Sequence, residues 1–239
     1  MFLTSLEGDC SALYTFGFHS TNAGDVLNWS SFNLTDPIWC CADTEPYPSG
    51  LTCTGNRITS FVAPSLQLEG FFDESFNSLD GLTFLDLSNN TYLYGSLTPL
   101  VTLHNLQEIW LADNFFTGSL SLFGQLTSLS SLSLKHNLLT GDLAGLSALS
   151  ALNFLSVGRN YLTGSVSPLS HLVSLDTLEL YDNELTGSLD SLSVLIHLKH
   201  LFISNNQFGT STFTQTLDFL QNLTELTLFY SSRNQIGGT

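Results

Sequence analysis

One pattern of residues, L-x-x-L-x-L-x-x-N-x-L-x-G, recurs along this chain and constrains its fold more than any other feature. The asparagines of five successive copies lie 23 residues apart, at Asn114, Asn137, Asn160, Asn183 and Asn206. A fixed period of about 20 to 50 residues is typical of repeat architectures, in which a single copy cannot bury its apolar face alone. The pattern therefore predicts a solenoid, one quasi-linear domain built by stacking copies.

The positions within a copy predict how each coil is built. The L-x-L pair alternates with a period of two, so it predicts a short strand whose leucines point inward. Stacking the copies would pair these strands into one parallel sheet on the concave face. An apolar run on the return leg, such as Leu120, Leu126 and Leu129, would close the coil.

The asparagine of each copy lies where the chain turns out of the strand, and its amide can satisfy backbone groups of its own and the neighbouring coil. Losing one such side chain should leave buried backbone groups unpaired, at a cost of roughly 1–3 kcal/mol each. The sequence predicts this asparagine ladder at Asn90, Asn114, Asn137, Asn160, Asn183 and Asn206.

The copies at both ends of the array depart from the rule. The first copy, 58–70, has Leu66 in place of the asparagine, and the next has one extra residue between Asn90 and Leu93. We expect the last copy to place Leu223, Leu226 and Leu228 at the core positions. Its N-x-I segment comes later than in the regular copies, at 234–236. No further return leg follows, so we expect no C-terminal cap and an open edge that exposes core leucines.

Four cysteines, Cys10, Cys40, Cys41 and Cys53, all lie in the first quarter of the chain. An even number in one short segment indicates two disulfides formed in an oxidising compartment. A zinc site is the alternative. It is disfavoured because the adjacent Cys40 and Cys41 can hardly both bind one tetrahedral ion, and because no C-x-x-C is present. We therefore expect no metal and no cofactor.

The chain carries 21 acidic residues against 5 basic ones, for a net charge of -16, although charged residues make up only 11% of it. Such a chain repels phosphate backbones and anionic membrane surfaces, so neither nucleic acid nor a membrane is expected as a partner. No apolar run is long enough to span a bilayer. Basic proteins, cations and neutral sugars stay compatible with this charge, which also serves simply to keep an exported protein soluble.

Four N-x-S/T sequons, at Asn28, Asn33, Asn89 and Asn222, are consistent with a secreted glycoprotein. A secretory signal is not visible, because the segment MFLTSL is short and lacks a basic region. The expected location is extracellular or at the cell surface.

The segment 9–59 carries DCSAL at its start, NW at 28–29, the pair Cys40–Cys41, GLTC ending at Cys53, and then NRIT. The repeats contain LTGSV at 162–166 and LTGSL at 185–189. Together these motifs cover nearly the whole chain and resemble plant-type extracellular leucine-rich-repeat proteins, the class of polygalacturonase-inhibiting proteins and receptor-kinase ectodomains. Two features depart from that class: the period is 23 instead of 24, and no proline follows the G-x-I position. The chain resembles a distant member.

The resemblance implies an α/β solenoid, a right-handed leucine-rich-repeat superhelix with a parallel concave sheet and a disulfide-stapled N-terminal cap. It implies the disulfides Cys10–Cys40 and Cys41–Cys53, a helix near 9–18, and a second short strand at each T-G-S-L segment. We expect the cap to occupy residues 1–57 and about eight repeats of roughly 23 residues to occupy 58–239.

In such solenoids the outward side chains of the concave sheet form an extended binding surface. A row of exposed aromatic residues is unfavourable on the surface of a monomer and suggests a contact site. Aromatic rings near carboxylates would suit a sugar or a basic protein, although some rings could merely pack across adjacent strands. The predicted ligand-binding face comprises Glu108, Trp110, Phe154, Glu179, Tyr181, Asp182, Phe202, Phe229 and Tyr230.

No catalytic motif is present: there is no G-x-S-x-G, no P-loop and no H-E-x-x-H, and the six histidines are scattered. We therefore expect no enzyme and no catalytic residues. The sequence favours a non-catalytic extracellular recognition module that binds a protein or glycan. Two alternatives stay open: a structural subunit of a cell-surface coat, matrix or filament that self-associates through the open C-terminal edge, and an ectodomain fragment of a receptor.

Overall fold

The computed structural model of the 239-residue chain describes Asp9, Leu13, Cys41 and residues 50–55, 57–209 and 216–236. The chain divides into two compact units, Met1–Thr117 (unit 1) and Gly118–Thr239 (unit 2). Within the described residues, no helix has the length and apolar character that crossing a bilayer requires. The expected Cys10–Cys40 disulfide and the sequons at Asn28 and Asn33 lie outside the described residues.

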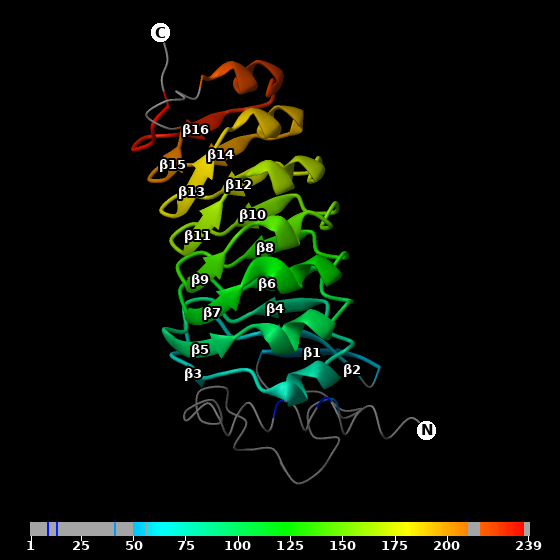
Figure 1. The fold of residues 1–239 in the computed structure, drawn as a ribbon. Helices are drawn as coiled ribbons and strands as arrows, with labels where there is room; N and C mark the ends of the chain where they lie inside the picture. Colours follow the sequence, from blue (N-terminus) through cyan, green and yellow to red (C-terminus); the bar gives the residue numbers. More distant parts are fainter. Residues whose placement is uncertain are drawn as a thin grey trace. The chain divides into compact units, whose positions relative to one another are not determined.

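Unit 1 contains two rows of strands joined by short 3₁₀ helices (Figure 1). In the first row β2, β4 and β6 are parallel, and β1 pairs antiparallel with β2. In the second row β3, β5 and β7 are parallel. The elements are β1 (Leu51–Thr54), β2 (Arg57–Val62), β3 (Glu69–Gly70), η2 (Glu74–Ser78), β4 (Phe84–Asp86), β5 (Tyr92–Ser96), η3 (Thr98–Thr102), β6 (Glu108–Trp110) and β7 (Phe115–Ser119).

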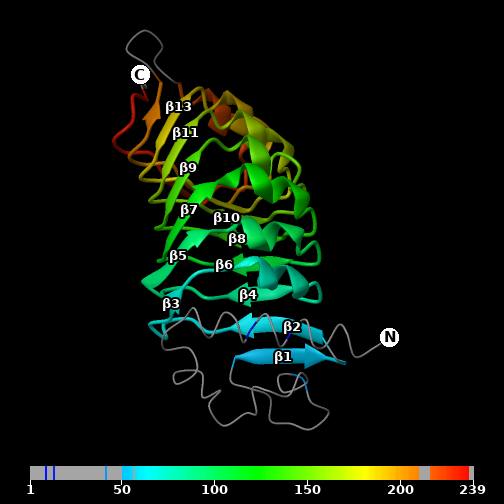
Figure 2. The same ribbon diagram turned by 60° about the horizontal axis from the view of Figure 1, so that its bottom comes forward.

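Unit 2 repeats the same arrangement. Its first row is the parallel series β8, β10, β12, β14 and β16, and its second row is β9, β11, β13 and β15 (Figure 1; β8 to β11 and β13 are seen from another side in Figure 2). The elements are η4 (Leu120–Gln125), β8 (Ser131–Ser133), β9 (Leu138–Gly141), η5 (Ala144–Leu146), β10 (Phe154–Ser156), β11 (Tyr161–Gly164), η6 (Ser167–His171), β12 (Thr177–Glu179), β13 (Glu184–Gly187), η7 (Asp190–Val194), β14 (His200–Phe202), β15 (Gln207–Phe208), η8 (Asp218–Asn222) and β16 (Leu228–Tyr230). The second row confirms the short strand expected at the T-G-S-L segments.

The return leg of each coil is helical because its leucines recur at every third residue. Leu189, Leu192, Leu195 and Leu198 are all fully buried. A 3₁₀ helix has three residues per turn, so this spacing directs all four side chains to one face. The N–H groups of Leu192, Leu195 and Leu198 each donate to the carbonyl three residues earlier, at 2.9–3.0 Å. The helical component of the described repeats is therefore 3₁₀, while Asp9 and Leu13 are α-helical, within the segment where the resemblance implies a helix.

From β4 onward, each strand of the first row is followed, three residues after its end, by a residue with a positive φ that directly precedes the asparagine of its copy. The series is Asn89, Asp113, His136, Arg159, Asp182, Asn205 and Arg233, with φ between 53° and 58°. This left-handed conformation costs roughly 1–2 kcal/mol for most residues other than Gly, Asn and Asp. The stacking offsets that cost, since the Arg159 N–H donates to the Tyr181 carbonyl of the next coil at 2.8 Å. The sharp turn directs the following asparagine into the coil.

The asparagine amides bridge successive coils. Asn160 Nδ2 donates to the carbonyls of Leu134, Val157 and Gly158 at 3.0–3.2 Å, and its Oδ1 accepts from the Leu139 N–H at 3.0 Å. The same two-way pattern recurs at Asn90, Asn206 and Asn234. Asn234 was not expected as a member, because it follows Asn206 after 28 residues instead of 23.

Asn114 lacks part of this pattern. Its Nδ2 donates to the carbonyls of Leu87, Leu111 and Ala112, but its buried Oδ1 has no hydrogen-bond partner. The preceding coil carries the extra residue after Asn90, and there the Leu93 N–H donates to the Asn90 carbonyl at 2.8 Å. Because of the insertion, the Leu93 N–H is not available to donate a hydrogen bond to Asn114 Oδ1.

The structure corrects the assignment of the last copy. The register pairs His200 with Leu228, Leu201 with Phe229, and Phe202 with Tyr230. Leu201 is fully buried, so Phe229 takes the inward position, where it packs edge-on against Phe219 with ring centroids 6.3 Å apart. Leu228, expected in the core, faces outward and is 43% exposed. The expectation that Phe229 belongs to the binding face is therefore wrong, because a longer connection before β16 shifts the copy by several residues.

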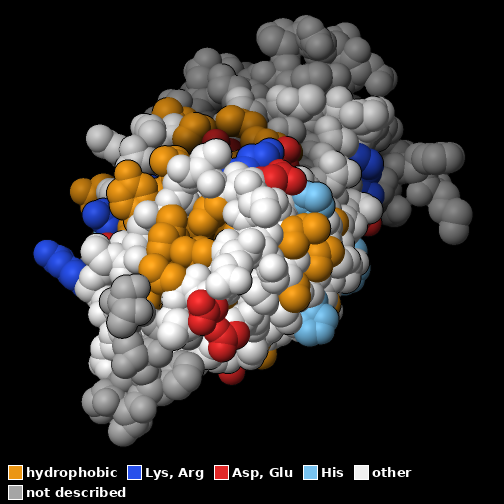
Figure 3. All heavy atoms as spheres, turned by 90° about the horizontal axis from the view of Figure 1, so that it is seen from above, with side chains coloured by type: hydrophobic (Ala, Val, Ile, Leu, Met, Phe, Trp, Pro, Cys, Tyr) orange, Lys and Arg blue, Asp and Glu red, His pale blue; other side chains and the backbone are white. Residues whose placement is uncertain are grey.

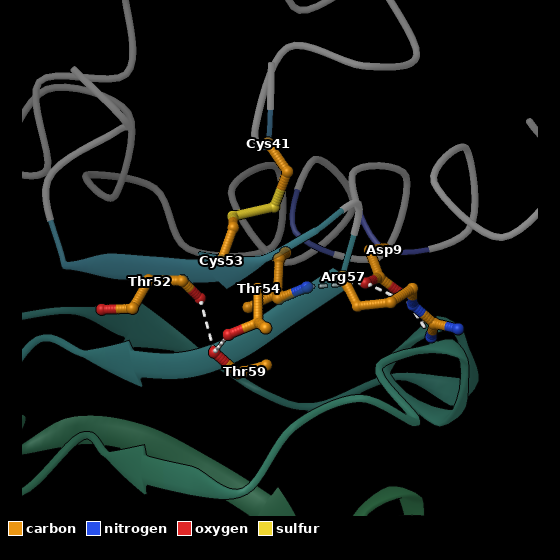
Figure 4. The surroundings of a disulfide bond; sticks show 8 residues. Asp9, Cys41, Thr52, Cys53, Thr54, Arg57 and Thr59 are labelled. Atoms are coloured by element: carbon orange, nitrogen blue, oxygen red, sulfur yellow. Dashed lines mark hydrogen bonds and ion pairs between the residues drawn. A yellow bond between two sulfur atoms is a disulfide. The ribbon is translucent and has the colours of Figure 1, made fainter. Parts of the chain in front are cut away.

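The N-terminal cap contains a disulfide and makes polar contacts with the first coil (Figure 4). Cys41 and Cys53 form a disulfide, which confirms that pairing. The fully buried carboxylate of Asp9 accepts from Arg57 Nε at 2.9 Å, from Arg57 Nη2 at 2.8 Å and from the Ile58 N–H at 2.9 Å. Arg57 also forms an ion pair with Asp80. Burial raises the pKa of Asp9 above its ordinary value, although the hydrogen bonds from Arg57 and Ile58 oppose the rise.

Candidate functional site

The outward side chains of the first strand row in unit 2 form two lines across the sheet, because parallel strands in register place equivalent residues side by side. The first line is Ser131, Phe154, Thr177, His200 and Leu228. The second is Ser133, Ser156, Glu179, Phe202 and Tyr230. A third line lies two residues beyond the second and includes Lys135, Gly158, Tyr181 and Ser204.

Residues of the second and third lines form an open pocket of about 370 Å³ in the later coils of unit 2. Its lining residues are Lys135, Glu179, Tyr181, Phe202, Ser204, Asn205 and Tyr230. The Tyr181 ring, which forms one wall of the pocket, lies directly over Gly158, where a side chain would collide with it. Ser204 lines the pocket one coil beyond Tyr181.

Groups of both charges, Lys135 and Glu179, line the pocket. Burial raises the pKa of Tyr181 above its usual value, and Lys135, which hydrogen-bonds the phenol, partly opposes that rise. The Glu179 carboxylate raises the pKa further. The pocket lining therefore contains a cation, Lys135, beside the Tyr181 hydroxyl, and a carboxylate, Glu179.

Polar contacts hold the carboxylates of this region. Glu179 Oε2 accepts from the buried Ser156 hydroxyl at 2.7 Å. Asp182 accepts from Arg159 Nε at 3.4 Å and also from the amide of Asn205. Asp182 is thus engaged in the rim formed by the left-handed turns and is not among the residues that line the pocket.

The aromatic wall is formed by Phe202 and Tyr230. Their rings are stacked, with centroids 5.2 Å apart and an interplanar angle of 14°. Tyr230 is 56% exposed, so much of the stack is open to solvent. Figure 3 views the protein from the end that carries β16 and η8, and hydrophobic side chains are visible there among polar ones. Such a ring pair offers an apolar contact surface with a polar hydroxyl at its edge.

Four of the expected face residues therefore meet in one pocket: Glu179, Tyr181, Phe202 and Tyr230. Phe154 is half-buried in the first line, outside the pocket. Glu108 and Trp110 belong to unit 1, where both lie on β6 and the Trp110 indole N–H donates to Glu108 Oε2 at 3.0 Å. Ser204 was not expected. It lies one coil beyond Tyr181 at the equivalent position, and the only signal for it in the sequence is that position.

Two sequons lie within the described residues, and both asparagines are exposed. Asn222 ends η8. Asn89 occupies a left-handed turn, and its Nδ2 donates to the Ser65 hydroxyl at 2.9 Å. Within the described segments, no group of three or more His, Cys, Asp or Glu side chains could hold a metal ion.

We compared the chain with known proteins in sequence and in fold. No model of a known protein family matches the chain. The receptor-like kinase TMK4 of Arabidopsis thaliana is 28% identical over 109 residues, which are 44% of this chain and 12% of the kinase.

Two solved structures show the fold. The PEPR1–AtPEP1 structure has a TM-score of 0.79 at 23% identity, covering 95% of this chain and 31% of PEPR1. The leucine-rich-repeat ectodomain of the Arabidopsis thaliana receptor kinase GASSHO1/SCHENGEN3, in complex with CASPARIAN STRIP INTEGRITY FACTOR 2, has a TM-score of 0.72 at 22% identity, covering 96% and 30%. The chain thus spans about a third of the length of the chains in these structures. It has the leucine-rich-repeat fold and is similar in that fold to plant receptor-kinase ectodomains.

Proposed function

We propose that this chain is a non-catalytic extracellular recognition module that binds a protein or glycan ligand on the concave face of its first strand row. The pocket lined by Tyr181, Phe202 and Tyr230 carries this proposal. Exposed, stacked aromatic rings are unfavourable on a free surface and are enriched where a partner covers them. The proposed location outside the cell is supported by the Cys41–Cys53 disulfide, because such bonds persist in oxidising compartments.

The similar solved structures support recognition as the role of the fold. The ectodomain of GASSHO1/SCHENGEN3 was solved with a bound factor. We propose that the present chain likewise acts by holding a ligand, with Glu179 and Lys135 fixing its orientation and the rings supplying contact area.

A binding screen with matched variants tests the proposal. Immobilised protein would be screened against a glycan array and against proteins secreted by the source tissue. Tyr181→Ala and Tyr230→Ala are expected to abolish the binding found, while circular dichroism and the melting temperature stay those of the wild type. Phe154→Ala, which changes an aromatic residue outside the pocket, is the control. Unchanged affinity in both pocket variants would remove the proposal.

A further inference from the structure

The Glu179 carboxylate is a charged group in the pocket lining with few partners from the protein itself. Among the described residues its one hydrogen bond comes from the Ser156 hydroxyl, at 2.7 Å. Two other carboxylates of unit 2 have cationic partners: Asp182 pairs with Arg159, and Asp176 with Lys199. Within the described part of the chain, no ion pair joins Glu179 to a cation. A ligand cation would supply the missing partner.

The aromatic wall lies directly beside this carboxylate. The register pairs Glu179 with Phe202 and Phe202 with Tyr230, so carboxylate and both rings occupy consecutive strands at intervals of about 4.8 Å. The planes of the two stacked rings are nearly parallel, at 14° to each other. A flat cation can therefore contact a ring face while its edge reaches Glu179. A cation over an aromatic face is attracted by the ring, and the neighbouring carboxylate would add to that attraction.

Charge complementarity points the same way. The chain carries a net charge of -16, and such a field attracts cations to its surface over several ångströms. Lys135 also lines the pocket and hydrogen-bonds the Tyr181 hydroxyl. It would repel a cation beside that hydroxyl, so Glu179 and the two rings are the favourable place for a bound cation.

We propose, on the basis of the recognition function proposed above, that this pocket binds an arginine side chain of a protein ligand. The guanidinium lies against the Phe202–Tyr230 stack and donates to Glu179. Arginine fits better than lysine because its guanidinium is planar, stacks on aromatic faces and is less strongly hydrated. The aliphatic part of the side chain packs against the Tyr181 ring.

The probes for the test are three: the peptide acetyl-Gly-Arg-Gly-amide, the same peptide with citrulline in place of arginine, and cellohexaose. Citrulline has nearly the shape of arginine without the charge. Binding is measured by NMR titration of the full chain. The arginine peptide is expected to bind at least about tenfold more tightly than the citrulline peptide, which corresponds to about 1.4 kcal/mol. Its binding should weaken as salt rises.

Variants assign the effect to the pocket. Glu179→Gln should reduce arginine-peptide affinity at least about tenfold, consistent with loss of a charged hydrogen bond, while its melting temperature stays unchanged. Glu184→Gln, which changes an exposed carboxylate on β13, is the matched control and should bind as the wild type does. Equal binding of the two peptides, or full affinity in Glu179→Gln, overturns the arginine assignment.

The outcomes also separate this inference from the recognition function. Binding of cellohexaose, or of a ligand from the screen, that Tyr230→Ala abolishes and Glu179→Gln leaves intact would overturn the arginine assignment and leave the recognition function standing. Absence of binding by all three probes and by every ligand in the screen would overturn both.

Discussion

The ring of Tyr181 lies so close over Gly158 that a β-carbon at position 158 would be 2.9 Å from Tyr181 Cε1 and 3.0 Å from both Cδ1 and Cζ. Real β-carbons essentially never make such short contacts, so the ring must move if position 158 gains a side chain. Gly158 is therefore the residue that permits this position of the Tyr181 ring, which forms one wall of the pocket.

We expect Gly158→Ala to push the Tyr181 ring toward Ser204 and narrow the pocket. The ring would become more exposed, so the raised pKa of Tyr181 should fall toward its ordinary value, because burial is the largest cause of the rise. Ultraviolet titration of Gly158→Ala, with Tyr181→Phe subtracted, measures that change.

A double variant provides the control for this prediction. In a Tyr181→Ala background the added methyl group meets no ring, so Gly158→Ala should there cost less stability than in the wild type. Equal costs in the two backgrounds would show that the contact between the ring and position 158 is not what makes glycine necessary.

The corrected register of the last copy predicts opposite behaviour of two neighbouring residues. Phe229→Ala should lower the free energy of unfolding by about 1–3 kcal/mol, less than a fully buried phenylalanine because the site is only half-buried. Leu228→Ala should change it by less than about 0.5 kcal/mol, because that side chain faces outward. Urea denaturation of both variants measures the difference. A larger loss for Leu228→Ala would restore the register expected from the sequence.

The asparagine ladder predicts a position-dependent cost of substitution. Asn160→Ala leaves the Leu139 N–H and several carbonyls without partners in a buried place, so we expect a loss of about 1–3 kcal/mol or more. Asn105→Ala is the matched control, because Asn105 is exposed and makes one bond to the Asp80 carbonyl at 2.7 Å. Its loss should stay below about 1 kcal/mol. Similar losses in both variants would argue against the ladder as a source of stability.

The buried carboxylate of Asp9 predicts a pH dependence of stability with a definite sign. Its pKa is raised above 3.8 in the folded protein, chiefly by burial, so the folded state retains a proton that the unfolded chain releases. Its contribution to stability is then fully present below the unfolded pKa and is lost as pH rises through the folded pKa.

The measurement compares the wild type with Asp9→Asn, which cannot titrate. The difference in free energy of unfolding, wild type minus variant, should fall as pH rises upward from about 3.8. Glu184→Gln, an exposed change in unit 2, corrects for general titration of the acidic chain. A difference that grows with pH would mean that pairing with Arg57 outweighs burial.

Much of the fold follows from the sequence because it depends on local spacing. The alternation of leucines sets the strands, and the recurrence of an apolar residue at every third position sets the return legs. The 23-residue interval places the asparagines. Each feature recurs in every regular copy, so one copy predicts the next. The resemblance to plant-type leucine-rich-repeat proteins added the Cys41–Cys53 disulfide and the second strand row, both of which the structure confirms.

The tertiary structure alone decided how the irregular last copy joins the array. The longer interval before Asn234 shifts the last copy, and only the pairing of β14 with β16 shows that Phe229 is inside and Tyr230 outside. The sequence predicted the aromatic and acidic residues of the face, but it did not predict which of them meet. That depends on packing between coils, such as that of the Tyr181 ring over Gly158, one coil earlier and 23 residues away. Short-range sequence patterns determine the secondary structure of each coil. The position of a pocket depends instead on how side chains of different volume pack between coils.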